Sequence, residues 1–210
     1  MAHEHPAEHD HAEHGHDHAG HAHAEHGHDH AGHAHVSYAD AVRAYRADKD
    51  DAFRLDPNSP IPDDAREGFV GLPYFDVDPS LRFEGLTLVP YQGHEPTSFQ
   101  IPTTDGQLRP AERAGEFRFD VDGTACRLTA YVFAGSDAHS LFVPFQDGTT
   151  GAETYGAGRY LDLEPDDDET FSLDFNLAYH PYCVYDARYS CPLTPPENRL
   201  AVRIEAGERL

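Results

Sequence analysis

The chain has 210 residues, with 15 Lys and Arg against 38 Asp and Glu, which gives a formal net charge of −23. So acidic a surface repels nucleic acid and anionic membranes, and we expect neither as a partner. No apolar run approaches the roughly 20 residues of a membrane span, and the N-terminus lacks a signal-peptide pattern. Because only three cysteines are present, we expect a cytoplasmic protein with reduced thiols.

The first 35 residues form a histidine-rich tail that holds 14 of the 17 histidines and no Lys or Arg. Ala12–His23 and Ala24–His35 are identical repeats of one twelve-residue unit. The tail contains almost nothing apolar beyond alanine, so we expect it to be disordered.

Clustered neutral imidazoles are typical ligands of zinc, nickel and copper. We therefore predict that the tail binds roughly three to four such divalent ions. A solubilising or proton-buffering tail is the open alternative. The predicted ligands are all tail histidines: His3, His5, His9, His11, His14, His16, His18, His21, His23, His26, His28, His30, His33 and His35.

Residues 36–210 are predicted to form a single, mainly β domain with one N-terminal α-helix. The helix is expected over residues 37–54, where Ser37 is a natural N-cap and Val42, Tyr45, Lys49 and Phe53 recur at helical spacing. It must end before Pro57. A short helical turn is expected within residues 63–69.

After this helix the apolar residues alternate with a period of two, which is typical of strands. Short turn-rich segments separate the predicted strands, which indicates an antiparallel meander closed as a barrel or folded as a sandwich. The predicted strands cover residues 82–89, 98–102, 115–121, 124–133, 140–145, 158–163, 170–177 and 199–204.

One hairpin can be predicted residue by residue, because Asp122-Gly123 is a two-residue turn of the primed type. The turn sets the register, and we expect the paired residues to share one core-facing side of the sheet. Cys126 is thus expected to be a small core residue. The predicted pairs are Val121 with Thr124, Phe119 with Cys126 and Phe117 with Leu128.

A polar ligand site is predicted where the strands 158–163 and 170–177 meet the glycine-rich loop 146–158. Glycines let backbone N–H groups approach a ligand, and arginine suits a carboxylate or phosphate. The proposed ligand-binding residues are Tyr155, Arg159, Asp174 and Asn176. The alternatives are solvent-facing side chains or an internal ion pair between Arg159 and Asp174.

The segment 178–196 offers a second candidate site. His180, Cys183 and Cys191 could be three zinc ligands, and Cys183 with His180 could form a nucleophilic pair. The remaining interpretation is a rigid, aromatic loop in which Cys183 and Cys191 lie close together as free thiols.

Several motifs resemble one bacterial and archaeal family, domain of unknown function 1684. The motifs are FVPF from Phe142, TYG from Thr154, GRYL from Gly158, LDFN from Leu173, YHPYC from Tyr179, YSCP from Tyr189 and Glu197-Asn198, together with YRADKDDAFRLDPNSPIP from Tyr45 and GLPYFDVDPSLRF from Gly71. The resemblance covers residues 38–209 and implies a soluble, self-contained domain without an assigned activity. The family pattern has asparagine in place of His180, which argues against a family-wide zinc site or Cys-His nucleophile. The tail lies outside the pattern.

These observations predict a binding protein in two parts, a metal-binding tail and a β domain that holds a small polar ligand. The alternatives are a hydrolase-like enzyme, with Asp174 as general base or Cys183 as nucleophile, and a structural or interaction module without a pocket.

Overall fold

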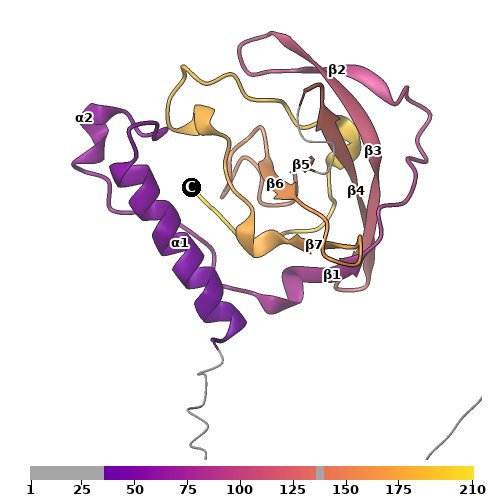
Figure 1. The fold of residues 1–210 in the computed structure, drawn as a ribbon, viewed down its shortest axis with the longest axis horizontal. Coiled ribbons are helices and arrows are strands. Elements are labelled where there is room, and N and C mark those ends of the chain that lie inside the picture. Colours follow the sequence, from indigo (N-terminus) through magenta and orange to yellow (C-terminus); the bar gives the residue numbers. More distant parts are fainter. Residues whose placement is uncertain (1–35, 136–139) are drawn as a thin grey trace, which may run out of the picture. The chain divides into compact units, whose positions relative to one another are not determined.

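The computed structural model describes residues 36–135 and 140–210 (Figure 1). Two α-helices precede seven strands, and short 3-10 helices lie in the connections and near the C-terminus. The helices and strands are α1 (Tyr38–Leu55), α2 (Asp63–Arg66), β1 (Arg82–Leu86), β2 (Ser98–Pro102), β3 (Leu108–Val121), β4 (Thr124–Phe133), β5 (Leu141–Phe145), β6 (Arg159–Leu163) and β7 (Phe171–Asp174). The 3-10 helices are η1 (Pro79–Leu81), η2 (Phe175–Leu177), η3 (Tyr182–Val184) and η4 (Pro196–Asn198).

Helix α1 begins and ends where the sequence predicts. The Ser37 hydroxyl accepts the N–H of Asp40, and the helix stops at Leu55, two residues before Pro57. Its buried face includes Arg46, which donates hydrogen bonds to the carbonyls of Phe75 (2.9 Å) and Asn176 (3.2 Å). The helix is thus bound by polar as well as apolar contacts. Among the described residues, no helix combines the length and the hydropathy of a membrane span.

The strands form two antiparallel sheets, as the mainly β prediction requires. β2 to β6 follow one another in a five-stranded meander, and β1 pairs with β7 in a two-stranded sheet. The alternative of a closed barrel is wrong for the described residues, because the order β2-β3-β4-β5-β6 leaves two edges unpaired.

One main core joins the two sheets. Alternate residues of β3 to β6 point into it, and they meet β7 and η2 from the other side. Phe119 of the large sheet, for example, lies 5.0 Å from the ring of Phe83 in β1 and 5.6 Å from that of Phe175 in η2. Each sheet therefore buries its apolar face against the other.

The β3–β4 hairpin confirms the predicted register. Val121 pairs with Thr124, and the ladder continues through the other predicted pairs. Asp122 and Gly123 have φ angles of 50° and 79°, the left-handed values that a primed turn needs. The shared core face is shorter than expected, because Thr124 is exposed and Cys126 is half-buried next to the turn.

Four predicted strands differ clearly from the structure. β1 ends at Leu86 rather than at residue 89, and β3 begins at Leu108 rather than at residue 115. Only Phe171–Asp174 of the segment 170–177 is a strand, because the Asp174 carboxylate accepts the N–H of Asn176 and starts the 3-10 helix η2. The segment 199–204 is not a strand beyond one isolated bridge between Arg199 and Gln146. Its Ile204 N–H is accepted instead by the Asp147 carboxylate at 2.7 Å.

Candidate functional site

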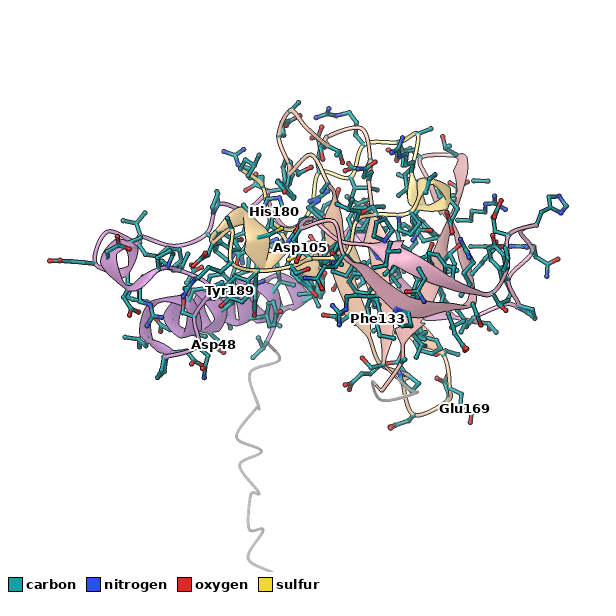
Figure 2. The ribbon with its side chains drawn as sticks, turned by 90° about the horizontal axis from the view of Figure 1, so that it is seen from above. Asp48, Asp105, Phe133, Glu169, His180 and Tyr189 are labelled. Carbon is teal, nitrogen blue, oxygen red and sulfur yellow. The ribbon has the colours of Figure 1, made fainter. Side chains whose placement is uncertain are left out.

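The hollow with the most varied chemistry lies between α1, the outer face of the large sheet and the segment 179–192. We call it the aromatic groove. Its volume is about 590 Å³. Viewed from above, Figure 2 shows Tyr189 and His180 between α1 and the strands, with Phe133 on the side of the strands. Eight aromatic side chains line the groove: Tyr45, Phe53, Phe133, Phe142, Tyr160, Tyr179, Tyr182 and Tyr189.

Strand alternation explains why this face is aromatic. In β6, Leu161 belongs to the main core whereas Tyr160 and Asp162 line the groove. In β5, Val143 is in the core and Phe142 faces the groove, so β5 is buried along its whole length. The sheet therefore has an aliphatic-rich core face and an aromatic groove face.

The aromatic rings of the groove walls pack against one another. Phe142 and Tyr160 meet at a centroid distance of 4.7 Å, and Tyr160 meets Tyr179 at 5.7 Å, both edge-to-face. On the opposite wall, Tyr182 packs edge-to-face on Tyr189 at 5.3 Å. Tyr182 and Tyr45 are nevertheless 40% and 47% exposed. Exposed aromatic surface gathered in one hollow is typical of a binding site.

Three charged side chains lie among the aromatic rings that line the groove. The Lys49 ammonium is bound 2.7 Å from the Glu208 carboxylate and lies 4.8 Å from the ring centroid of Tyr179. Asp162 accepts the Tyr179 hydroxyl at 2.5 Å, and burial raises the pKa of its carboxyl. The exposed Arg109 guanidinium stacks on Phe133 at 4.8 Å and forms no ion pair with any described residue. Arg109 is thus the cation of the groove that is available to an anionic ligand.

A buried polar cluster around Glu208 lies beside the groove. The Glu208 carboxylate accepts the backbone N–H of His180 at 2.6 Å and the hydroxyl of Tyr185 at 2.9 Å, in addition to its ion pair with Lys49. His180 Nε2 accepts the N–H of Tyr155 at 3.2 Å. Burial, followed by the charges of Arg159 and Lys49, lowers the pKa of His180 to about 4, so the ring is neutral near pH 7. The cluster joins the C-terminus to α1.

Arg159, predicted as a ligand clamp, has partners within the domain. It is 1% exposed, and it donates to the carbonyls of Ile204 (2.8 Å), Glu208 (3.1 Å) and Ala206. Its nearest carboxylate is Asp147 at 3.5 Å, so the predicted ion pair with Asp174 does not form. Burial lowers the pKa of this guanidinium. Arg159 binds the C-terminal segment to β6.

Asp174 and Asn176 are the two members of the predicted ligand site that meet, with Asn176 Nδ2 3.1 Å from the Asp174 carboxylate. Asp174 also accepts the Tyr38 hydroxyl at 2.7 Å. The Asn176 amide donates to the carbonyl of Asp78 and accepts its N–H, both at 2.8 Å. These side chains connect α1 and the residues before β1 to η2. Their hydrogen-bonding groups are occupied, as those of a structural pair are.

The glycine-rich loop 146–158 is anchored by buried side chains, although Gly148, Gly151 and Gly156 are exposed. Thr149 and Thr154 are fully buried, with their hydroxyls 3.1 Å apart. Gly158 has a φ of 104°, and a Cβ there would lie 2.4 Å from the Phe145 carbonyl oxygen. At this position, glycine serves close packing.

Of the second predicted site, Cys183 and Cys191 lie close together, with the Cys183 N–H directed at Cys191 Sγ at 3.4 Å. In the described part of the chain, no group of three or more His, Cys, Asp and Glu is placed to hold a metal ion. Cys183 has the Tyr155 hydroxyl as its neighbour, at 4.0 Å, and the imidazole Nε2 is occupied by the backbone. The predicted tail ligands fall outside the described residues.

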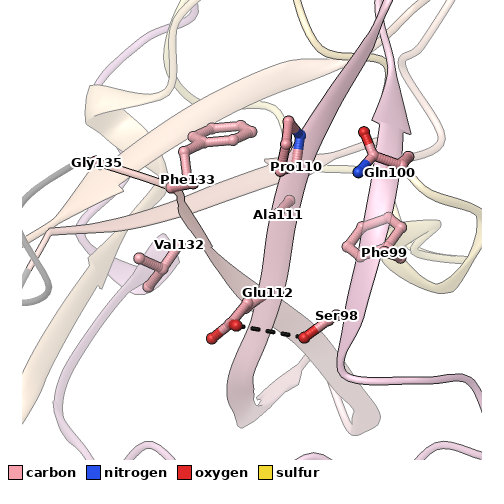
Figure 3. A pocket seen from close by; sticks show the side chains of 10 residues that line it. Ser98, Phe99, Gln100, Pro110, Ala111, Glu112, Val132, Phe133 and Gly135 are labelled. Atoms are coloured by element: carbon pink, nitrogen blue, oxygen red, sulfur yellow. Dashed lines mark hydrogen bonds between the residues drawn. The ribbon is translucent and has the colours of Figure 1, made fainter.

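A second hollow, of about 600 Å³, lies over β2, β3 and β4 (Figure 3). Its one carboxylate, Glu112, is 3.3 Å from the Ser98 hydroxyl, and its remaining lining is mostly apolar or backbone. It also ends at Gly135, where the described range stops. This hollow offers little chemistry beside that of the groove.

Sequence reasoning missed the groove residues Lys49, Arg109 and Asp162. The two wall segments are far apart in the chain, and the helical spacing of Lys49 indicates only the packing face of a helix. One signal was present, since four tyrosines recur at positions 179, 182, 185 and 189. Tyrosine at this density in a proline-containing loop is unusual for mere surface.

The chain belongs to a family described as protein of unknown function (DUF1684), whose model matches residues 67–209. This confirms the family resemblance. A solution NMR structure of an uncharacterized protein of Haloarcula marismortui is similar, with 41% identity and a TM-score of 0.61 over 81% of this chain and 92% of that one. No curated protein matches the chain.

Proposed function

We propose that the domain binds a small planar organic acid in the aromatic groove, with the ring between the aromatic walls and the acid group on Arg109. The observation that carries this proposal is the aromatic lining of one open hollow, in which Arg109 has no carboxylate partner among the described residues. The volume of about 590 Å³ lies in the ordinary range for small-molecule sites.

Ring contacts supply the affinity in this account. Each offset or edge-to-face aromatic pair contributes roughly 0.5–1.5 kcal/mol beyond its buried area, and Tyr45 and Tyr182 still have exposed ring surface to cover. Ordered walls also lower the entropic cost of binding, because few side chains must be immobilised.

The charged side chains of the groove favour a ligand with one acidic group. A guanidinium offers a planar fork that matches a carboxylate. Lys49 already neutralises Glu208, so it does not add a second anion site. Asp162 repels a second acidic group, so the account favours a monoacid over a diacid.

Titration calorimetry of the full chain with 1-naphthoate tests the proposal. The matched uncharged probe is 1-naphthalenemethanol, which has the same rings. We expect naphthoate to bind about tenfold more tightly, a difference of about 1.4 kcal/mol. In Arg109→Gln the two probes should bind alike. Arg43→Gln, which removes an exposed charge outside the groove, should keep the difference. Equal binding of both probes by the unmodified chain, or absence of binding, would contradict the proposal.

A second proposal concerns the N-terminal tail, which we infer binds divalent zinc, nickel or copper. It rests on 14 histidines within 35 residues and on the tandem repeat. Neutral imidazole is the ligand, so binding should weaken below about pH 6. Zinc titration of the full chain should give roughly three to four ions at pH 7.5. The same stoichiometry in a chain that starts at Val36 would refute it.

A further inference from the structure

Two of the three cysteines lie side by side at the edge of the groove. The backbone N–H of Cys183 points at Cys191 Sγ, at an N–S distance of 3.4 Å. Both are free thiols, and Cys191 itself lines the groove. The third, Cys126, lies on β4, where its Sγ is 3.4 Å from the Thr124 carbonyl oxygen.

Each cysteine is held by its own segment. Cys191 is bound on both sides of its backbone to Thr104, its N–H by the Thr104 hydroxyl (3.1 Å) and its carbonyl by the Thr104 N–H (2.9 Å). Cys183 lies in the 3-10 helix η3, and the chain returns through a turn in which Tyr189 N–H donates to the Asp186 carbonyl at 3.1 Å. The two thiols are thus kept close by the fold.

We propose that Cys183 and Cys191 are a redox-active pair that forms an intrachain disulfide by exchange with a low-molecular-weight disulfide such as oxidised glutathione. This inference is independent of the proposed ligand. It assigns a modification site to a segment that the groove proposal uses only as a wall.

The two cysteines have different parts in the exchange. Cys183 is half-buried and Cys191 is buried, so Cys183 is the thiol that an outside disulfide reaches. Burial and the neighbouring Cys183 thiol raise the pKa of Cys191 to about 11, which keeps it protonated until it reacts. Cys183 is the attacking thiol and Cys191 the resolving thiol.

The atoms and electrons balance over two steps. The Cys183 thiolate attacks one sulfur of oxidised glutathione, a mixed disulfide forms, and one glutathione thiolate leaves. Cys191 then loses its proton to solvent and attacks the Cys183 sulfur, and the second glutathione thiolate leaves. The two cysteines are oxidised, and one glutathione disulfide is reduced to two thiols.

The linkage closes a short loop that carries Tyr189 and begins directly after Tyr182. Because Cys191 is bound to Thr104, the disulfide would tie this groove wall to the residues after β2. Cross-linking a loop of this length stabilises a chain by lowering the entropy of its unfolded state. We expect the thermal midpoint of the oxidised protein to rise by about 5 °C.

Peptide mapping of the full chain tests the pair directly, because trypsin cleaves after Arg188, between the two cysteines. After incubation with oxidised glutathione and alkylation of free thiols, we expect peptides 160–188 and 189–199 as one disulfide-linked species. Cys126 should be alkylated. Dithiothreitol should release the two peptides.

Variants sharpen the result. Cys126→Ser should behave as the unmodified chain does. Cys191→Ser should stop at the mixed disulfide, with one glutathionyl group on Cys183. Three alkylated cysteines after oxidation, a linkage that includes Cys126, or a disulfide between two chains would each overturn the proposal.

Discussion

The β3–β4 hairpin and the C-terminal segment 175–210 are built on different principles. The hairpin is a ladder of backbone hydrogen bonds whose register follows from one turn and one alternating pattern. The C-terminal segment contains no strand; distant residues bind its backbone through scattered backbone hydrogen bonds and through buried side chains such as those of Arg159 and Asp147. The comparison shows that a buried polar residue that the sequence predicts as a ligand contact, such as Arg159, can instead hold an irregular segment in place.

Asn198 illustrates the second principle. Its side chain is fully buried, and it donates to the carbonyls of Thr129 (2.8 Å) and Pro144 (2.7 Å) while it accepts the Thr129 N–H (2.8 Å). One amide thus satisfies backbone groups of both β4 and β5, which pair directly at Tyr131 and Phe142 alone. The Asn198 side chain thus satisfies backbone N–H and C=O groups that a neighbouring strand would otherwise satisfy.

The largest effect is expected at the main connector of the C-terminal segment. Arg159→Ala removes the donors to three buried carbonyls and leaves Asp147 uncompensated, so we expect the free energy of unfolding to fall by up to about 5 kcal/mol. Urea unfolding without any ligand measures it. Arg43→Ala, an exposed arginine in a helical pair, should cost no more than about 0.5 kcal/mol. If Arg159→Ala hardly changed the free energy of unfolding, Arg159 would not be a structural connector, and the ligand-clamp role predicted from the sequence would be favoured.

The hairpin should respond to loss of apolar volume. Phe119 packs on Phe83 and Phe175, and Phe119→Ala should cost about 3 kcal/mol in urea unfolding because it leaves a cavity in the main core. Its strand neighbour Arg118 points to the other face and is largely exposed, so Arg118→Ala should cost under about 1 kcal/mol. The reverse order would mean that the register is shifted by one residue.

The buried imidazole makes stability depend on pH. The pKa of His180 is lowered from 6.5 to about 4 by burial, so the unfolded chain takes up a proton between these values while the folded chain does not. The free energy of unfolding should therefore fall as the pH drops from about 6.5 to about 4, with His180 contributing about 2 to 3 kcal/mol. His180→Gln should show a flatter pH dependence, measured as the difference between pH 7 and pH 4. His94→Gln, an exposed histidine, is the control. An equal pH dependence in both variants would show that His180 is not held neutral by the fold.

The smallest effect belongs to the hairpin turn. The Asp120 carboxylate accepts the N–H of Gly123 at 2.7 Å, so Asp120→Ala should cost about 1 kcal/mol although the side chain is exposed. Asp167→Ala, at an exposed position in another turn, should change the free energy of unfolding by less than about 0.5 kcal/mol. If Asp120→Ala and Asp167→Ala lowered the free energy of unfolding equally, the hydrogen bond from Gly123 to Asp120 would not contribute to stability.

Local rules were sufficient for the parts of the fold that depend on near neighbours. Ser37 and Pro57 predict the bounds of α1, and Asp122-Gly123 predicts the hairpin. The same rules fail at residues 199–204, because an alternating pattern cannot reveal that Asp147, more than 50 residues away, captures the backbone of Ile204. The end of strand β7 was missed for a similar reason, since a capping Asp174 reads as a strand residue.

The candidate site was less accessible to sequence reasoning than the fold. Strand alternation places Tyr160 and Asp162 on the face opposite Leu161, yet alternation alone does not say whether that face is covered. The answer depends on α1 and on the segment 179–192, both distant in the chain. Tertiary contacts thus convert an ordinary outer sheet face into the aromatic groove.

The location of a bound planar acid tests the central claim most directly. In the full chain labelled with ¹⁵N and ¹³C, saturating 1-naphthoate should shift the resonances of Lys49, Phe53, Arg109, Tyr182 and Tyr189, which surround the groove. Resonances of Asp174, Asn176 and the loop 146–158 should move little. Shifts centred on that loop and on Arg159 would contradict the account and favour the polar site predicted from the sequence.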